Sequence, residues 1–386
     1  MQYTDKSLLL VANPSNYHVY NYIKNILVPA GIRVTMYSIN GPVKDLKEEY
    51  KSYYDQQSIK LVDGIQIVSV LNPRYIDYII KSVKRIKSLG HFDYLHEFYM
   101  LHLIAPVLYL SRKQFIRITL TFFGSDLYRV KGTKRLLLQP LLNCAHHITL
   151  ITSDMYNYFV NNPPQNKRLQ PKCKIIDVGN MFYGTIDKIK AANNKTSLKK
   201  QFGFDEEKLV VSIGYMGRKE MQQYETIQSI LSMDVNLISR IQLAIPAYRL
   251  SDSEYDRIKR LLDESPLKND YIIFTHFMGE NEVSSFRIMT DIFIHAQTSD
   301  ALSNAMMEHL YAGSVVVNGE WLNYSSLDDN GIDYIKFKDF RNLGGVLTNV
   351  INNFFSLSQA AIKNHDIVYS ISSWDALRSK WLSNYD

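Results

Sequence analysis

Cysteine is scarce in this sequence, which has only Cys144 and Cys173 in 386 residues. Two thiols provide neither a disulfide framework nor a cysteine metal cluster, and they favour a reducing compartment. No apolar run approaches the roughly 20 residues that span a bilayer. The N-terminus lacks the basic and apolar segments of a signal sequence, because Asp5 and Lys6 lead directly into Leu8. We therefore expect a cytoplasmic protein.

Motifs of three other protein classes are also absent. The Gly-x-Gly-x-x-Gly pattern of dinucleotide-binding dehydrogenases does not occur. No Asp-x-Asp stands between a strand and a loop, and Asp328 and Asp329 have no further ligands nearby in the sequence. No recognised nucleic-acid-binding motif is present. We therefore expect no metal site, no bound cofactor and no nucleic-acid partner.

The composition and length fit a two-domain globular protein, with 46% hydrophobic and 21% charged residues. The net charge of +6 is unevenly distributed. Residues 1–170 contain 21 basic and 11 acidic residues, whereas the rest of the chain contains 23 basic and 27 acidic ones. The positive charge therefore belongs to the N-terminal half.

Three basic segments concentrate this charge: a helical stretch with Lys81, Lys84, Arg85 and Lys87 opposite Ile79, Ile80, Val83 and Ile86; the pair Arg112 and Lys113; and residues 131–135. Basic side chains beside an apolar face suit an anionic membrane surface. The alternative is that the apolar stripe is core and the charges only keep the surface soluble, which the helix alone favours. Because the whole half is basic, we predict peripheral contact with the inner face of a membrane.

Apolar runs that end in small or polar residues predict two parallel-sheet domains. Strands are expected at 8–12, 31–38, 65–70, 94–98, 117–122, 147–151 and 174–180, then at 209–213, 241–245, 272–275, 292–295 and 314–317. Helices are expected at 19–27, 222–231 and 372–385, and residues 184–208, rich in Lys and Asn with little apolar periodicity, lead into the second domain. The predicted domains are 1–182 with 370–386, and 183–369.

The most informative segment is 292–318, which is typical of a strand, a short helix and a second strand. Ser303 is the expected N-cap of the helix, and Gly313 is expected to close it in the left-handed conformation. Asp300 and Glu308 flank the start of the helix, and carboxylates there can accept hydrogen bonds from the vicinal hydroxyls of a ribose or hexose. The alternative for Glu308 is a solvated helix residue.

Residues 298–316 resemble the signature of family-four-type glycosyltransferases of the GT-B fold, in which two acidic residues eight apart precede a Gly and a Val-Val strand. The resemblance implies that Asp300 contacts the donor sugar and that Glu308 holds the ribose, with Ser303 and Asn304 beside them. The family's first acid is usually Glu, one methylene longer than Asp300. The implied fold is α/β with two Rossmann-like domains facing across a cleft and a C-terminal helix that crosses back to the N-terminal domain.

A second candidate site lies at Gly214, Gly217, Arg218 and Lys219, between a strand and a helical stretch. Glycines let backbone amides approach a ligand, and adjacent cations at a helix N-terminus suit a diphosphate. The family keeps its phosphate-binding Arg and Lys here, although it usually spaces them by several residues. The resemblance makes Arg218 and Lys219 the groups that neutralise the leaving nucleoside diphosphate, with Lys219 preferred.

The segment His276 to Gly279 lies where the family's backbone holds the nucleotide base, which makes Phe277 and Met278 donor-site candidates. The alternative for Phe277 is a core residue.

In the N-terminal half, Ser125 and Asp126 belong to a Gly-Ser-Asp turn like one the family has at its cleft. Asp126 is a candidate sugar or acceptor contact, or alternatively an N-cap. Asn16 and His18 follow the first strand and are expected to meet phosphate or acceptor, although His18 also fits a surface histidine. His96 resembles the family's buried His and is favoured as a satisfied core residue rather than a base.

The sequence thus predicts a metal-independent, hexosyltransferase-type enzyme of cell-surface polysaccharide or glycoconjugate synthesis. It would transfer a sugar from a nucleoside-diphosphate donor to a glycan or lipid-linked glycan acceptor, with retention of configuration if the family's usual stereochemistry holds. The alternative is a catalytically inactive GT-B-like sugar-binding or partner subunit of a glycosyltransferase complex. That alternative is motivated by the shorter Asp300 and by the adjacency of Arg218 and Lys219.

Overall fold

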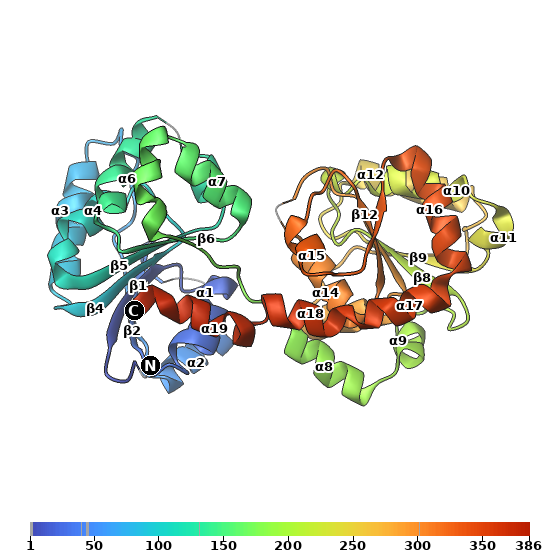
Figure 1. Cartoon of the computed structure of the whole chain (residues 1–386), viewed down its shortest axis with the longest axis horizontal. Coiled ribbons are helices and arrows are strands. Elements are labelled where there is room, and N and C mark those ends of the chain that lie inside the picture. The colour runs from blue at the N-terminus through green and yellow to red at the C-terminus, as the bar shows by residue number, and fades with distance from the viewer. Residues whose placement is uncertain (1–2, 40, 44–45, 131, 301) are drawn as a thin grey trace. The chain divides into compact units, whose positions relative to one another are not determined.

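A computed structural model describes residues 3–39, 41–43, 46–130, 132–300 and 302–386 (Figure 1). The chain divides into two compact units. Unit 1 comprises Met1–Gly179 and Trp374–Asp386, and unit 2 comprises Asn180–Ser373. Both units are α/β, each with a parallel sheet covered by helices. No helix within the described ranges is long and apolar enough to cross a bilayer.

The sheet of unit 1 has the strand order β3-β2-β1-β4-β5-β6-β7, and each described pairing is parallel. The strands are β1 (Ser7–Ala12), β2 (Arg33–Ser38), β3 (Lys60–Val62), β4 (Phe92–Phe98), β5 (Phe115–Phe122), β6 (His147–Leu150) and β7 (Cys173–Ile175). Both faces are buried, so β1 is a continuous apolar run rather than an alternating one.

Helices cover both faces of this sheet, as Figure 1 shows. One face carries α3 (Tyr75–Lys87), α4 (Ala105–Leu110), η2 (Arg112–Gln114), α5 (Ser125–Tyr128), α6 (Thr133–Cys144), α7 (Ser153–Asn161) and η3 (Pro164–Lys172). The other carries α1 (Tyr17–Tyr22), its π-helical continuation η1 (Ile23–Leu27), α2 (Glu48–Gln56), α19 (Trp374–Leu382) and η5 (Ser383–Tyr385).

The C-terminal helix α19 belongs to unit 1, as the sequence predicts. Trp374 and Trp381 are buried in the core beneath the sheet, and the indole of Trp381 donates to the Asp177 carbonyl at 3.0 Å. Tyr385 extends this contact, because its hydroxyl lies 2.7 Å from the hydroxyl of Tyr22. Packing of two indoles and a buried phenol therefore fixes the end of the chain to the first sheet.

The sheet of unit 2 has the order β10-β9-β8-β11-β12-β13, again with parallel pairings. Its strands are β8 (Leu209–Ile213), β9 (Ile241–Pro246), β10 (Tyr271–Phe274), β11 (Ile292–His295), β12 (Val315–Gly319) and β13 (Ile335–Phe337). The helices are α8 (Tyr183–Ala192), α9 (Lys195–Gln201), η4 (Lys219–Met221), α10 (Gln223–Leu231), α11 (Val235–Ile238), α12 (Asp252–Asp263), α13 (Glu280–Met289), α14 (Asn304–Ala312), α15 (Ser325–Asp329), α16 (Phe340–Asn352), α17 (Phe354–Ile362) and α18 (Asn364–Ser372).

The sequence prediction of a strand at 65–70 is wrong, and two further features are not predicted. Residues 65–70 are irregular, and the edge strand is Lys60–Val62, which pairs with Thr35–Tyr37. The short strand β13 is not anticipated by the apolar pattern. Residues 184–208 carry α8 and α9, in which Ile186 and Leu198 are buried while four of the lysines form ion pairs. A few well-spaced apolar residues are enough to dock two short helices.

Candidate functional site

The predicted donor residues of unit 2 follow β8, β10 and β11. Because these strands are parallel, the loops after them lie at the carboxyl edge of the sheet, where open α/β sheets bind ligands. The loop after β8 carries Gly214 to Lys219, the loop after β10 carries Phe277 and Met278, and the loop after β11 carries Asp300.

Both glycines of the loop after β8 serve close packing. A Cβ on Gly217 would lie 2.4 Å from the Ala247 carbonyl oxygen, and Gly214 has a φ of +67°, so larger residues would clash or be strained. Their amides already have partners, because Gly214 donates to the Ile294 carbonyl at 3.1 Å and Gly217 donates to the Tyr248 carbonyl at 2.9 Å. The glycines therefore position the loop rather than offering their own amides to a ligand.

Arg218 and Lys219 follow on this loop, and both are exposed. Arg218 is the N-cap residue of η4, and Lys219 begins that turn just ahead of α10. Neither side chain forms an ion pair with any residue in the described ranges. The two charges are thus available to an anionic ligand at the carboxyl edge of unit 2.

Asp300 lies in a polar cluster with His295, the last residue of β11, and with Tyr324. Its Oδ2 accepts a hydrogen bond from the Tyr324 hydroxyl at 3.3 Å and lies 3.7 Å from His295 Nε2. The same Tyr324 hydroxyl is 3.0 Å from His295 Nε2. Asp300 keeps 19% of its side chain exposed, so the cluster holds the carboxylate in place at the edge while leaving part of it accessible.

Tyr215 connects this cluster with the cationic loop. Burial and the negative charge of Asp300 raise the pKa of its hydroxyl to about 12, and the positive charge of Arg218 opposes this shift. The hydroxyl donates to Gln297 Oε1 at 2.9 Å. Asp300 and Arg218 therefore act electrostatically on one half-buried phenol, which remains protonated at neutral pH.

Glu308 is buried, with only 4% of the residue exposed, so its interpretation as a solvated helix residue is wrong. Oε2 accepts from Arg287 Nε at 3.1 Å, and Oε1 accepts from Asn180 Nδ2 at 3.3 Å. Burial raises the pKa of this carboxyl, and the Arg287 charge opposes the shift. Arg287 also contacts His309 Nε2 at 3.1 Å. Both Glu308 oxygens therefore have protein partners.

Phe277 is 70% exposed, so its alternative interpretation as a core residue is wrong. Its ring packs edge-on against Tyr248, which follows β9, with centroids 5.5 Å apart. The Arg249 guanidinium lies 5.2 Å from the centroid of the same Tyr248 ring. Met278 beside them is half-buried. The exposed ring of Phe277 thus offers an apolar face at the carboxyl edge on which a nucleobase can stack.

The start of α14 has the predicted caps. Ser303 is buried and its hydroxyl accepts from the Met306 amide at 3.2 Å, while Gly313 has a φ of +88° at the other end of the helix. Both predictions are confirmed. Asn304, the first helical residue, is exposed.

Unit 1 has a pocket of about 410 Å³ at the carboxyl ends of its central strands. It brings together three of the residues predicted for the acceptor or phosphate side, Asn16, His18 and Ser125. The other lining residues are Asn13, Val19, Ile39, Phe98, Tyr99, Leu101 and Phe123. The polar residues follow β1 and β5, and the aromatic ones follow or end β4 and β5.

Asp126 is buried and supports this pocket without lining it. Its Oδ1 accepts from the amides of Phe123 at 2.8 Å and Gly124 at 2.9 Å, and its Oδ2 accepts from the Met100 amide at 2.9 Å. Burial raises the pKa of Asp126 to about 6. The carboxylate thus ties the loop after β4 to the loop after β5, which differs from both the direct contact and the N-cap considered from the sequence.

His96 is fully buried in β4, and its preferred interpretation as a satisfied core residue is confirmed. Nδ1 lies 2.7 Å from the Tyr385 hydroxyl, and Nε2 lies 2.8 Å from Thr121 Oγ1. Burial lowers the pKa of the imidazole to about 3, so it is neutral at physiological pH.

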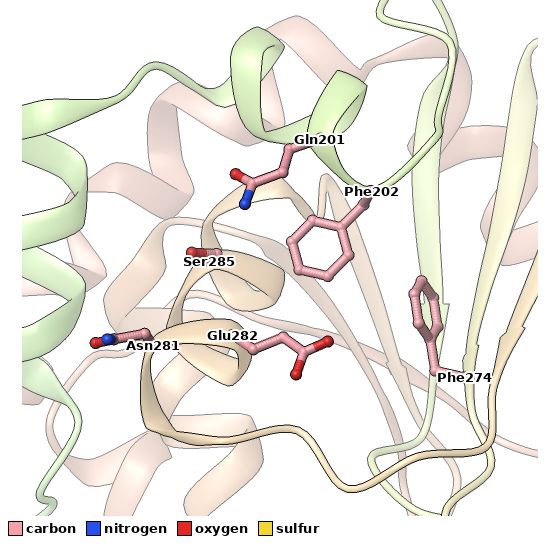
Figure 2. A pocket seen from close by; sticks show the side chains of 6 residues that line it. All are labelled: Gln201, Phe202, Phe274, Asn281, Glu282 and Ser285. Atoms are coloured by element: carbon pink, nitrogen blue, oxygen red, sulfur yellow. The ribbon is translucent and has the colours of Figure 1, made fainter.

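A further hollow of about 490 Å³ lies in unit 2 and contains none of the predicted residues (Figure 2). It is lined by side chains from α9, β10 and α13: Gln201, Phe202, Phe274, Asn281, Glu282 and Ser285. Figure 2 shows Glu282 extending from α13 toward Phe274, with Phe202 above it. Glu282 also pairs with His276 at 2.5 Å.

The sequence matches no model of a protein family and no protein of curated function. The fold nevertheless matches solved structures over almost the whole chain. A glycosyltransferase from Rickettsia africae superposes with a TM-score of 0.70 at 13% identity, covering 98% of this chain and 97% of the other. The Anabaena protein HepE, in complex with UDP and glucose, gives 0.67 at 10% identity, covering 98% of both chains.

A trehalose-phosphate synthase from Burkholderia vietnamiensis is similar with a TM-score of 0.61 at 11% identity, covering 98% of this chain and 99% of that enzyme. These similarities, together with two parallel Rossmann-like sheets, define the class: the chain has the GT-B fold of glycosyltransferases, as the sequence predicts.

Several site residues are not anticipated from the sequence, namely Tyr99, Tyr215, Tyr248, His295 and Tyr324. Each lies at the carboxyl end of a strand or in the loop that follows it. That position is the available signal, because aromatic and polar residues just beyond a predicted parallel strand lie at the ligand-binding edge.

Proposed function

We propose that this protein is a glycosyltransferase that transfers a sugar from a nucleoside-diphosphate donor to a glycan or lipid-linked glycan acceptor in cell-surface polysaccharide or glycoconjugate synthesis. The observation that carries the proposal is the placement of Arg218 and Lys219, two exposed cations without ion-pair partners in the described ranges, at the carboxyl edge of unit 2 in a chain with the GT-B fold. HepE, which shares this fold, has been solved in complex with UDP-glucose.

In this proposal unit 2 binds the donor. The diphosphate lies against Arg218 and Lys219, the base packs on Phe277, and the sugar is held by Asp300 from its cluster with His295 and Tyr324. Charge neutralisation by the two cations stabilises the leaving diphosphate as the glycosidic bond breaks. A retaining reaction would follow a front-face substitution, with the leaving phosphate accepting the proton of the acceptor hydroxyl.

Unit 1 receives the acceptor in its pocket between the ends of β1, β4 and β5. Membrane contact is supported by the surface of α3, where Ile76 and Ile80 are 69% and 49% exposed one turn apart. Lys84, one further turn along, is exposed as well. Exposed apolar side chains beside basic ones suit the surface of an anionic bilayer. In the basic segment 131–135, Lys131 lies outside the described residues.

The test is a transfer assay in which the full-length protein is incubated with a panel of nucleotide sugars and neutral glycosides, and the products are detected by mass spectrometry. The proposal expects one donor to yield a glycosylated product, with turnover lost in Lys219→Ala and kept in Lys268→Ala, another exposed lysine of unit 2. Proton NMR of the product's anomeric centre tests retention. Inverted configuration would overturn the front-face mechanism.

The second candidate is a non-catalytic, sugar-binding or partner subunit with the GT-B fold. The observation that favours it is Glu308, whose two carboxylate oxygens already bind Arg287 and Asn180. A ribose held by Glu308 would have to displace at least one of these partners. Tight nucleotide binding without transfer to any acceptor would support this candidate over the enzyme.

A further inference from the structure

Tyr99, at the end of β4, has a φ of +87°, a left-handed conformation that costs a residue with a Cβ about 1 kcal/mol or more. The two residues that follow it are each held by a buried carboxylate. The Leu101 amide donates to Glu97 Oε1 at 2.8 Å, and the Met100 amide donates to Asp126 Oδ2 at 2.9 Å. The surrounding loop therefore imposes this conformation on Tyr99.

The strained backbone orients an aromatic surface at the pocket of unit 1. The Tyr99 ring is 36% exposed and lies 6.2 Å from the Phe123 ring, between centroids. Its hydroxyl lies 2.5 Å from Ser125 Oγ, which fixes the ring from the other end. Tyr99 and Ser125 both line the pocket. A ring secured at both ends loses little further freedom when a ligand packs on it.

The same pocket is also lined by polar groups that are unused. Asn13 and Asn16 use Oδ1 to accept the backbone amides of Ser15 and His18, at 3.0 and 2.8 Å. Their Nδ2 groups, and both nitrogens of the His18 ring, make no hydrogen bond to another described residue. Burial lowers the pKa of His18 to about 4, so the ring offers one donor and one acceptor at neutral pH.

Among the described residues, ten side chains line the pocket, and none of them is charged at neutral pH. A phosphate or carboxylate entering it would lose hydration without gaining a cation in return. A sugar ring presents the opposite chemistry, with apolar C–H faces for an aromatic ring and hydroxyls that both donate and accept. The described lining therefore favours an uncharged ligand.

We propose that this pocket binds an uncharged sugar residue, with one face of the sugar packed on Tyr99 and its hydroxyls directed to Asn13, Asn16 and His18. The pocket's role as an acceptor site rests on the proposed function. The inference deepens that function, because it specifies an acceptor that ends in a neutral sugar. It resolves the choice between phosphate and acceptor at Asn16 and His18 in favour of the acceptor. Glu97 and Asp126 are positioning residues for Tyr99.

The test measures binding to the full-length protein by saturation-transfer NMR. The ligands are methyl glycosides of neutral hexoses and the corresponding hexose 6-phosphates. We expect a neutral glycoside to bind with a dissociation constant of about a millimolar, and the phosphates at least tenfold more weakly. Tyr99→Gly removes the ring at a position where glycine is unstrained, and it should weaken glycoside binding at least tenfold. Tyr99→Phe should retain it.

Ser58→Gly is the matched control, because Ser58 also has a positive φ, +53°, on unit 1 but does not line the pocket. It should leave glycoside binding unchanged. Binding of hexose phosphates in preference to neutral glycosides, or unaltered glycoside binding in Tyr99→Gly, would overturn the inference. Nucleoside diphosphate binding measured in parallel reports on unit 2, so failure of the proposed donor function is distinguishable from failure here.

Discussion

The carboxylate of Glu308 lies 3.1 Å from the guanidinium Nε of Arg287, and their side chains are only 5% and 6% exposed. Glu308 comes from α14 and Arg287 from α13, so the ion pair joins two helices that cover the same face of the second sheet. Asn180, the first residue of unit 2, donates to the other carboxylate oxygen. The pair therefore fixes the start of the unit to its interior.

Removing one partner of this pair should be strongly destabilising, because it leaves the other charge buried. We expect Glu308→Ala to lower the free energy of unfolding by about 3–5 kcal/mol, measured by urea denaturation. Asp328→Ala breaks an exposed pair with Lys336 and should cost no more than about 1 kcal/mol. Equal stability of Glu308→Ala and the unsubstituted protein would contradict the structural role.

Substituting Arg218 or Lys219, in the loop after β8, should affect ligand binding rather than stability. Arg218→Ala and Lys219→Ala remove exposed side chains and should leave the melting temperature unchanged. Each should weaken binding of a nucleoside diphosphate roughly 10-fold to 100-fold, since a charge-assisted hydrogen bond contributes about 1.5–3 kcal/mol. Isothermal titration calorimetry measures this, with Lys268→Ala as the control. If both variants bind as tightly as the control, the phosphate assignment is wrong.

Glu97 should make unit 1 less stable in alkali. Burial raises its pKa from 4.5 to about 8, and Oε2 is buried without a partner in the described ranges. The folded state therefore binds more protons than the unfolded state between these values. The resulting stabilisation is complete below pH 4.5 and is lost as the pH rises through about 8.

Glu97→Gln keeps an acceptor for the Leu101 amide but cannot ionise. Its melting temperature should be close to that of the unsubstituted protein at pH 4 and higher than it at pH 9. The Tyr78 hydroxyl interacts electrostatically with the Glu97 carboxyl and could also ionise in alkali. Tyr78→Phe therefore serves as the control for phenol ionisation. A constant difference between Glu97→Gln and the unsubstituted protein across this range would show that Glu97 does not titrate there.

Membrane contact through α3 should depend on both charge and apolar exposure. The unsubstituted protein is expected to co-sediment with phosphatidylglycerol vesicles at low salt and to dissociate as salt is raised. Replacing both Ile76 and Ile80 with Ser should weaken this binding, as should Lys84→Glu. Ile362→Ser removes an apolar side chain of unit 2 that is 57% exposed and should have no effect. Binding to uncharged vesicles of equal strength would refute the electrostatic contribution.

Much of the fold follows from local pattern. Continuous apolar runs predict nearly all the parallel strands, and Ser303 and Gly313 mark the ends of α14 because capping depends on adjacent residues. The irregular segment 65–70 shows the limit of this reasoning. Its apolar residues pack on the core, but β3 supplies the residues that pair with β2, and pairing is not a local property.

The sequence predicts where the site residues lie relative to the strands, but not which residues they contact. The sequence locates Asp300, Arg218, Asn16 and His18 beyond strand ends. It does not reveal that Glu308 meets Asn180, 128 residues away, because that contact requires the completed fold. For the same reason Glu97 and Asp126 cannot be recognised from the sequence as supports for Tyr99.

The central claim is that unit 2 binds a nucleoside diphosphate, and a thermal-shift panel of nucleoside diphosphates without added metal tests it most directly. A ligand that binds the folded state at 100 times its dissociation constant adds about 2.7 kcal/mol of stability. We predict a rise of several degrees in melting temperature for one nucleotide, diminished in Lys219→Ala and preserved in Lys268→Ala. No rise with any nucleotide at millimolar concentration would contradict the claim.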